Sequence, residues 1–233
     1  MSLLSLEAVN THIGQYHILQ GVDLEVGAGE IVAMLGRNGA GKTTTLKTIM
    51  GLHPRTGGTV RFDGDEIGEL RPYEVASLGI GYVPEDRAIF ADLSVEENLR
   101  IAERERGDLA GSIEFIHDLF PDLARLAELP GTSLSGGQQQ MLAVARALVA
   151  ENRLLLIDEP SEGLAPVIIE QMMEAIRSIS SDTTVLLVEQ NFVVASQLAQ
   201  HYVILEEGRT VASGAMADLV DDDETINRYL GAG

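Results

Sequence analysis

The segment Gly36-Arg37-Asn38-Gly39-Ala40-Gly41-Lys42-Thr43 decides the fold of this chain. It fits the pattern G-x-x-x-x-G-K-[ST], follows the apolar run Ile31–Leu35, and precedes a helix predicted to extend to about Met50. Strand, glycine-rich loop and helix in this order are typical of a phosphate-binding loop. The glycines let backbone N–H groups turn inward, and the helix start adds partial positive charge. The pattern predicts that Lys42 reaches the β- and γ-phosphates of a nucleotide and that the Thr43 hydroxyl binds Mg²⁺. We include the next residue, Thr44, among the predicted nucleotide contacts.

Composition excludes several other classes of site. The chain has 233 residues, 45% of them apolar, which suits one domain with an inserted lobe. It contains no cysteine, which excludes disulfide scaffolds, cysteine–zinc sites and thiol nucleophiles. The formal net charge of −20 repels phosphate backbones, so we expect no nucleic-acid partner. We find no membrane-length apolar run and no signal peptide, and we therefore expect a soluble, cytoplasmic protein.

The chain divides into three stretches by its hydrophobic pattern. Short predicted strands separated by glycine-rich turns fill the N-terminal stretch. The middle, from about residue 86 to 150, is charged and helical, with helices predicted over 95–105, 112–120 and 135–150. Continuous apolar runs at Leu154–Ile157 and Val185–Val188 then alternate with helix-like segments, as expected for buried parallel strands. The alternation predicts an α/β fold with a helical insertion: a single domain over 1–233, with a core of 1–85 and 151–233 and a helical lobe of about 86–150.

A pair of acids follows the first of these late apolar runs. Asp158 and Glu159 come directly after Leu154–Ile157, so a buried strand delivers them to the edge of the sheet near the phosphate loop. There Asp158 is expected to bind Mg²⁺ directly or through water. Glu159, one residue further, is a candidate general base for water that attacks the γ-phosphate in line. The alternative is an ordinary surface turn after a strand.

A second glycine-rich helix start lies at Leu134-Ser135-Gly136-Gly137-Gln138. Ser135 followed by two glycines is either a simple helix N-cap or another anion site with inward N–H groups. A second phosphate-binding helix start serves little purpose within one nucleotide site. It makes sense if it caps ATP that is bound on another copy.

With Leu134–Gln138 between the phosphate loop and the two acids, the chain resembles the ATP-binding subunits of ABC transporters over nearly its whole length. The resemblance implies an α/β fold: a P-loop NTPase core with a mainly parallel sheet, an N-terminal antiparallel β-subdomain and an inserted helical lobe. It also implies a head-to-tail dimer that sandwiches two ATP molecules with Mg²⁺. The phosphate loop of one subunit and Ser135–Gln138 of the other hold each ATP, and Ser161-Glu162-Gly163-Leu164 crosses the interface.

The chain departs from the family pattern at three positions. Glu85 stands where the family usually has a glutamine, and a carboxylate there could bind Mg²⁺ more strongly. Gln190 stands where the family has a switch histidine; its amide can donate a hydrogen bond to the γ-phosphate but cannot carry a positive charge. Ile13 occupies the position at which the family usually has an aromatic residue that stacks on adenine. Tyr16 is a possible substitute for that aromatic residue.

Further motifs narrow the resemblance to one ATPase subunit of branched-chain amino-acid importers. They are Val83-Pro84-Glu85, Ser94-Val95-Glu96-Glu97-Asn98-Leu99, Gly163-Leu164-Ala165-Pro166 and Val188-Glu189-Gln190-Asn191. The resemblance implies permease partners, a second ATP-binding subunit (a heterodimer mate, or a second copy), an indirect substrate-binding protein, and attachment to the inner face of the membrane through the permeases. Ala88-Ile89-Phe90 is the expected docking patch, unless Phe90 packs in the lobe. Urea, amides or another polar solute remain alternative substrates, and a soluble ABC protein or an ATP-dependent clamp remain alternative functions.

Overall fold

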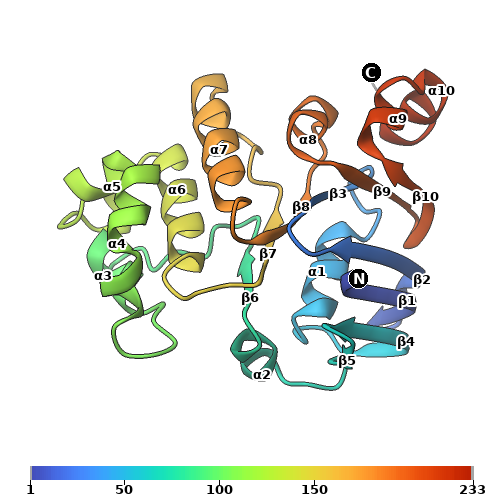
Figure 1. Cartoon of the computed structure of the whole chain (residues 1–233), viewed down its shortest axis with the longest axis horizontal. Helices are drawn as coiled ribbons and strands as arrows, with labels where there is room; N and C mark the ends of the chain where they lie inside the picture. Colours follow the sequence, from blue (N-terminus) through green and yellow to red (C-terminus); the bar gives the residue numbers. More distant parts are fainter. Residues whose placement is uncertain (1, 232–233) are drawn as a thin grey trace.

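The computed structural model describes residues 2–231, which form two sheets flanked by helices (Figure 1). The strands are β1 (Ser2–Ile13), β2 (Tyr16–Gly27), β3 (Ile31–Leu35), β4 (Arg55–Phe62), β5 (Asp65–Glu66), β6 (Ile80–Val83), β7 (Leu154–Asp158), β8 (Thr184–Val188), β9 (His201–Glu206) and β10 (Arg209–Ala215). The helices are α1 (Lys42–Ile49), α2 (Pro72–Ser77), α3 (Val95–Arg100), α4 (Asp108–Leu119), α5 (Pro121–Arg125), η1 (Gly131–Ser133), α6 (Gly136–Ala147), α7 (Pro166–Ile179), α8 (Phe192–Leu198), α9 (Met216–Val220), α10 (Asp223–Thr225) and η2 (Ile226–Leu230).

The larger sheet has six strands in the order β10-β9-β3-β8-β7-β6, and the smaller has four in the order β2-β1-β4-β5. In the larger sheet every pair is parallel except β9 with β10, whereas all pairs of the smaller sheet are antiparallel. The two sheets confirm the predicted α/β class, with a mainly parallel core and an antiparallel β-subdomain. Because β7, β3 and β8 run in parallel, their carboxyl ends meet at one edge, where the loops that follow them can form a site.

Alternate residues of β3 divide the core into two layers. Ile31, Ala33 and Leu35 pack with α6, α7, α8 and the lobe, whereas Val32 and Met34 pack with α1 and the smaller sheet. A fully apolar strand of this kind is expected where helices or strands cover both faces of a sheet. The phosphate loop therefore follows a strand that is buried on both sides.

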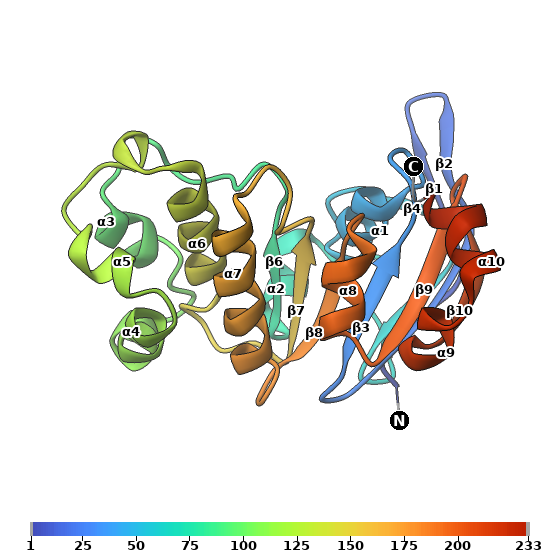
Figure 2. The ribbon, with the colours of Figure 1, turned by 90° about the horizontal axis from the view of Figure 1, so that it is seen from above.

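Helices α3 to α6 lie beyond β6 and form the lobe inserted between β6 and β7 (Figure 2). The helix predicted over 95–105 is wrong in its second half, because α3 ends at Arg100. Side chains cap the backbone beyond it: Glu103 accepts the N–H groups of Gly107 and Leu109, and Asp108 accepts that of Arg104. Such local bonds compete with helix continuation. No helix in the described part of the chain has the length and hydropathy to cross a membrane.

Candidate functional site

The phosphate loop connects the end of β3 to α1. Gly36 has φ 146° and Gly41 has φ 105°, a region that favours glycine. A Cβ at Gly36 would also collide with the carbonyl oxygen of Leu205 on β9. Gly39 also has positive φ (81°), so the backbone conformation favours glycine at all three positions, and packing adds to this at Gly36. The loop positions between Gly36 and Gly41 differ in exposure: Arg37, Asn38 and Gly39 are exposed, whereas Ala40 is buried.

Lys42 is buried at the first position of α1, and its ammonium group turns back over the loop. Lys42 Nζ donates to the carbonyl oxygens of Gly36 (2.8 Å) and Arg37 (3.3 Å). It also lies 3.0 Å from Oε1 of Glu159, with side chains only 4% and 8% exposed. The lysine and the acid predicted from separate motifs thus form a direct ion pair. Glu159 adopts φ 46°, a left-handed conformation that costs energy in a residue other than glycine and is concentrated at functional sites.

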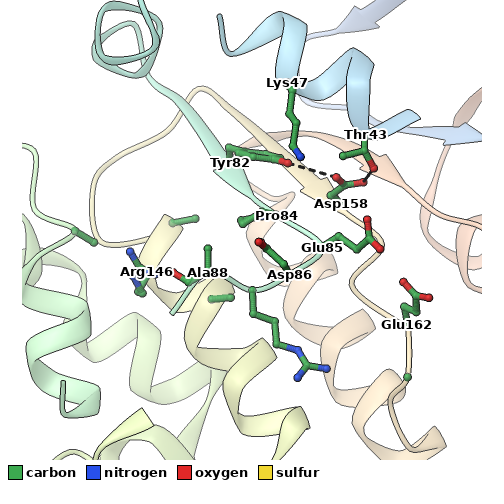
Figure 3. A pocket seen from close by; sticks show the side chains of 15 residues that line it. Thr43, Lys47, Tyr82, Pro84, Glu85, Asp86, Ala88, Arg146, Asp158 and Glu162 are labelled. Carbon is green, nitrogen blue, oxygen red and sulfur yellow. Dashed lines mark hydrogen bonds between the residues drawn. The ribbon is translucent and has the colours of Figure 1, made fainter. Parts of the chain in front are cut away.

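Asp158 ends β7 beside Thr43 (Figure 3). Thr43 Oγ1 donates to its Oδ1 at 3.2 Å, and the Tyr82 hydroxyl donates to its Oδ2 at 3.4 Å. Burial raises the pKa of Asp158 to about 6, against the opposing effect of the Thr43 hydrogen bond. Burial also raises the pKa of Tyr82, so this hydroxyl stays protonated and acts as a donor. Both contacts hold the carboxylate at the carboxyl end of the sheet.

Two further acids lie beside the phosphate loop. Glu85 and Glu162 line both cavities beside the loop, the one of about 390 Å³ next to Lys42 and the one of about 830 Å³ next to α6. Burial, and then the neighbouring carboxylates Glu159 and Glu85, raise the pKa of Glu162. The combined negative charge favours a bound cation, and an approaching polyphosphate needs such a cation to avoid repulsion.

The glycine-rich start of α6 lies apart from these cavities, because none of its residues, Ser135, Gly136, Gly137 or Gln138, lines either one. Ser135 Oγ accepts the N–H of Gln138, and the Gln138 side chain accepts the N–H of Ser135. The segment is therefore a capped helix start, exposed at Ser135 and Gly136. Arg87, which follows Glu85 by two residues, donates to Gln139 and Gln140 and connects the two segments.

The remaining predicted residues, Gln190, Ile13 and Tyr16, do not line the two cavities beside the phosphate loop. Gln190 is exposed after β8, in the turn that leads to α8. Ile13 and Tyr16 face each other across the β1–β2 hairpin, 38% and 65% exposed, and neither lines either cavity. Ile18, which sequence reasoning did not select, does line the smaller cavity.

The model of the ABC transporter family matches residues 19–162, which include the phosphate loop, the start of α6 and both acids. The chain belongs to the ABC transporter family. It is an ATPase, and it serves as the ATP-hydrolysing subunit of a transporter. The predicted family resemblance is confirmed.

Individual relatives align with this ABC ATPase from end to end. It is 40% identical over 232 residues to the high-affinity branched-chain amino acid transport ATP-binding protein BraG of Pseudomonas aeruginosa, covering 98% of this chain and 100% of that protein. It is 36% identical to a probable branched-chain amino acid transport ATP-binding protein LivF of Archaeoglobus fulgidus, covering 98% and 99%. A nucleotide-free ATP-binding cassette from an ABC transporter superposes with a TM-score of 0.87 over the whole of both chains, at 22% identity, which shows the shared fold.

Besides Ile18, the sequence did not indicate Tyr82, Arg87 and Glu189 as residues near the site. Glu189 stands inside the motif Val188–Asn191, and Tyr82 directly precedes Val83-Pro84-Glu85, but a single sequence carries no signal for which side chain turns toward the site. Arg87 could have been suspected only from its charge in an acidic chain.

Proposed function

We propose that the chain binds and hydrolyses MgATP at the phosphate loop and so drives the import of branched-chain amino acids through separate permease subunits. The observation that carries the proposal is the convergence of Lys42, Thr43, Asp158 and Glu159 at one edge of the parallel sheet. The relatives named for branched-chain amino acid transport, which align over the full chain, support the substrate class.

Thr43 and Asp158 fit Mg²⁺, because a hydroxyl and a carboxylate are hard oxygen ligands and their oxygens already lie 3.2 Å apart. Glu85, on the wall of both cavities, is the third candidate ligand. Among residues 2–231 no three acidic or histidine side chains lie close enough to hold a metal ion unaided, so phosphate and water oxygens would complete the ligand set. When bound, Mg²⁺ supplies positive charge that offsets the negative charge of the phosphates.

The Lys42–Glu159 ion pair suggests how nucleotide entry prepares the chemistry. Lys42 exchanges Glu159 for oxygens of the β- and γ-phosphates, while backbone N–H groups of Gly36–Thr43, with Thr44, hold the triphosphate. Glu159, released from the ammonium group, then accepts a proton from the attacking water. Gln190 donates an amide hydrogen bond to the γ-phosphate, a role that needs no ionisable group. For adenine we retain Ile13 and Tyr16 as candidates and add Ile18.

The exposed start of α6 is suited to act on another cassette. We propose that Ser135–Gln138 caps the ATP held by the phosphate loop of a second ATP-binding subunit, in a head-to-tail dimer. Its absence from both cavities of its own chain supports this arrangement. Glu85 and Gln190 favour a heterodimer, because a mate could supply the usual glutamine and histidine in the opposite site.

We propose that the permeases dock on the segment Ala88-Ile89-Phe90, which begins at the wall of the larger cavity. Arg87 and Ala88 both have positive φ (63° and 47°), which turns the segment after Glu85 toward α6. Phe90 is 46% exposed, with the Arg146 guanidinium 4.8 Å from its ring centre, so an apolar ring is presented beside the cavity. Permease subunits bound here would hold the chain at the inner face of the membrane, fed indirectly by a substrate-binding protein.

Reconstitution with the permeases and the second ATPase subunit tests the proposal. We expect ATP-dependent leucine uptake that Glu159→Gln abolishes, while Glu114→Gln, which removes an exposed acid of α4 that lines neither cavity, retains uptake. Uptake of urea or another polar solute instead of leucine would overturn the substrate class. Copurification with ribosomes rather than permeases, without ATP-driven uptake, would overturn the transport function.

A further inference from the structure

Glu189 is a buried acid that the proposed chemistry does not use. It follows the last residue of β8 and is only 1% exposed. A carboxylate is rarely buried so completely unless several donors satisfy it. The burial of the Glu189 carboxylate therefore indicates a structural or functional role.

Three hydrogen bonds converge on this carboxylate. Its Oε1 accepts the backbone N–H of Ser161 at 3.2 Å, and its Oε2 accepts the Ser161 hydroxyl at 3.0 Å and the N–H of Asn191 at 3.3 Å. The bonds tie the turn after β7 to the turn after β8. Burial raises the pKa of Glu189 to about 7, and these same bonds oppose that rise by stabilising the ionised form.

The two turns that Glu189 connects carry Glu159 and Gln190. Ser161 follows Glu159 by two residues, and Gln190 lies between Glu189 and Asn191. The backbone reinforces the connection: Glu159 N donates to the carbonyl of Val188 at 2.9 Å, and Glu189 N donates to that of Met34, on the strand that leads to the phosphate loop, at 3.2 Å.

We propose that Glu189 is a positioning residue of the ATPase, which fixes Ser161 and Asn191 and thereby sets Glu159 and Gln190 in their relative orientation for attack on the γ-phosphate. This inference rests on the roles of Glu159 and Gln190 proposed above. A carboxylate suits the position because it accepts from all three donors at once. A glutamine amide could accept from Ser161 N and donate to Ser161 Oγ, but its NH₂ group would face the N–H of Asn191.

The test compares Glu189→Ala, Glu189→Gln and Ser161→Ala in the reconstituted complex. Thr184→Val is the matched control, because it removes a side-chain bond to the N–H of Gly29 at the opposite end of the same strand. We expect Glu189→Ala to lower kcat at least about tenfold while the Kd for ATP of the isolated chain stays within about twofold, since the phosphate loop is intact. Glu189→Gln should recover part of kcat, and Ser161→Ala added to Glu189→Ala should cause no further loss.

Equal kcat for Glu189→Ala and Thr184→Val would overturn the inference, as would parallel losses of ATP binding and turnover. If Glu189→Ala does not fold, Glu189→Gln and Ser161→Ala provide the test. A kcat equal to that of Thr184→Val in both variants would equally overturn the inference. A wild-type complex that lacks ATP turnover refutes the proposed function itself. Wild-type turnover with unaffected Glu189 variants refutes only the positioning role.

Discussion

Replacing Glu159 by glutamine should make the isolated chain bind ATP more tightly while it slows turnover. Nucleotide binding needs the Lys42 ammonium group, which lies 3.0 Å from the Glu159 carboxylate with both side chains nearly buried. A charged hydrogen bond contributes about 1.5–3 kcal/mol and a neutral one about 0.5–1.5 kcal/mol. The substitution thus weakens the competing contact by about 1–1.5 kcal/mol, which corresponds to about tenfold lower Kd. Loss of the general base should slow hydrolysis at least about a hundredfold.

Calorimetric titration of the nucleotide-binding step, with MgATP at low temperature, measures this Kd directly. Glu162→Gln is the control, because it removes an acid of the same cavity that has no contact with Lys42. It should lower Kd much less. An unchanged or higher Kd for Glu159→Gln would refute the exchange of Lys42 from Glu159 to phosphate.

Four further results are expected. Lys42→Ala should abolish ATP binding in the same titration. Gly36→Ala should lower Tm and weaken ATP binding in thermal melts and titrations, because the added Cβ meets the Leu205 carbonyl at φ 146°. The free energy of unfolding of the nucleotide-free wild type, relative to that of Glu189→Gln, should fall as pH rises from about 4.5 to about 7, because folded Glu189, with its pKa raised to about 7, keeps a proton that the unfolded chain releases. Urea melts of the wild type and of Glu189→Gln should show that this difference in unfolding free energy changes by about 3 kcal/mol over that pH range. Phe90→Ser should leave ATP binding by the isolated chain unchanged but reduce copurification with the permeases.

Much of the fold was predictable because its signals are local. The phosphate loop, the apolar run that ends in Asp158 and the helical middle stretch each depend on neighbouring residues, and the structure has strands and helices in these places. The early end of α3 was missed because it depends on Glu103 and Asp108 capping the backbone beyond Arg100.

The site was predictable in its parts but not in its connections. Lys42 and Glu159 were selected from separate motifs, yet no sequence pattern indicates that they form an ion pair. Glu189 was visible only as the neighbour of Gln190, because its contact with Ser161 joins turns far apart in the chain and depends on β7 and β8 being adjacent.

A cross-link from the start of α6 tests the shared ATP site most directly. The chain has no cysteine, so Ser135→Cys introduces the only thiol of this chain, which is labelled with a photoreactive cross-linker in the Glu159→Gln background before the transporter is assembled. With MgATP we expect cross-links to the phosphate-loop peptide of a second cassette, either another copy or a mate, and their loss when that loop carries a lysine-to-alanine substitution. Cross-links confined to the chain's own peptides, or identical with and without ATP, would contradict an ATP site completed by a neighbouring cassette.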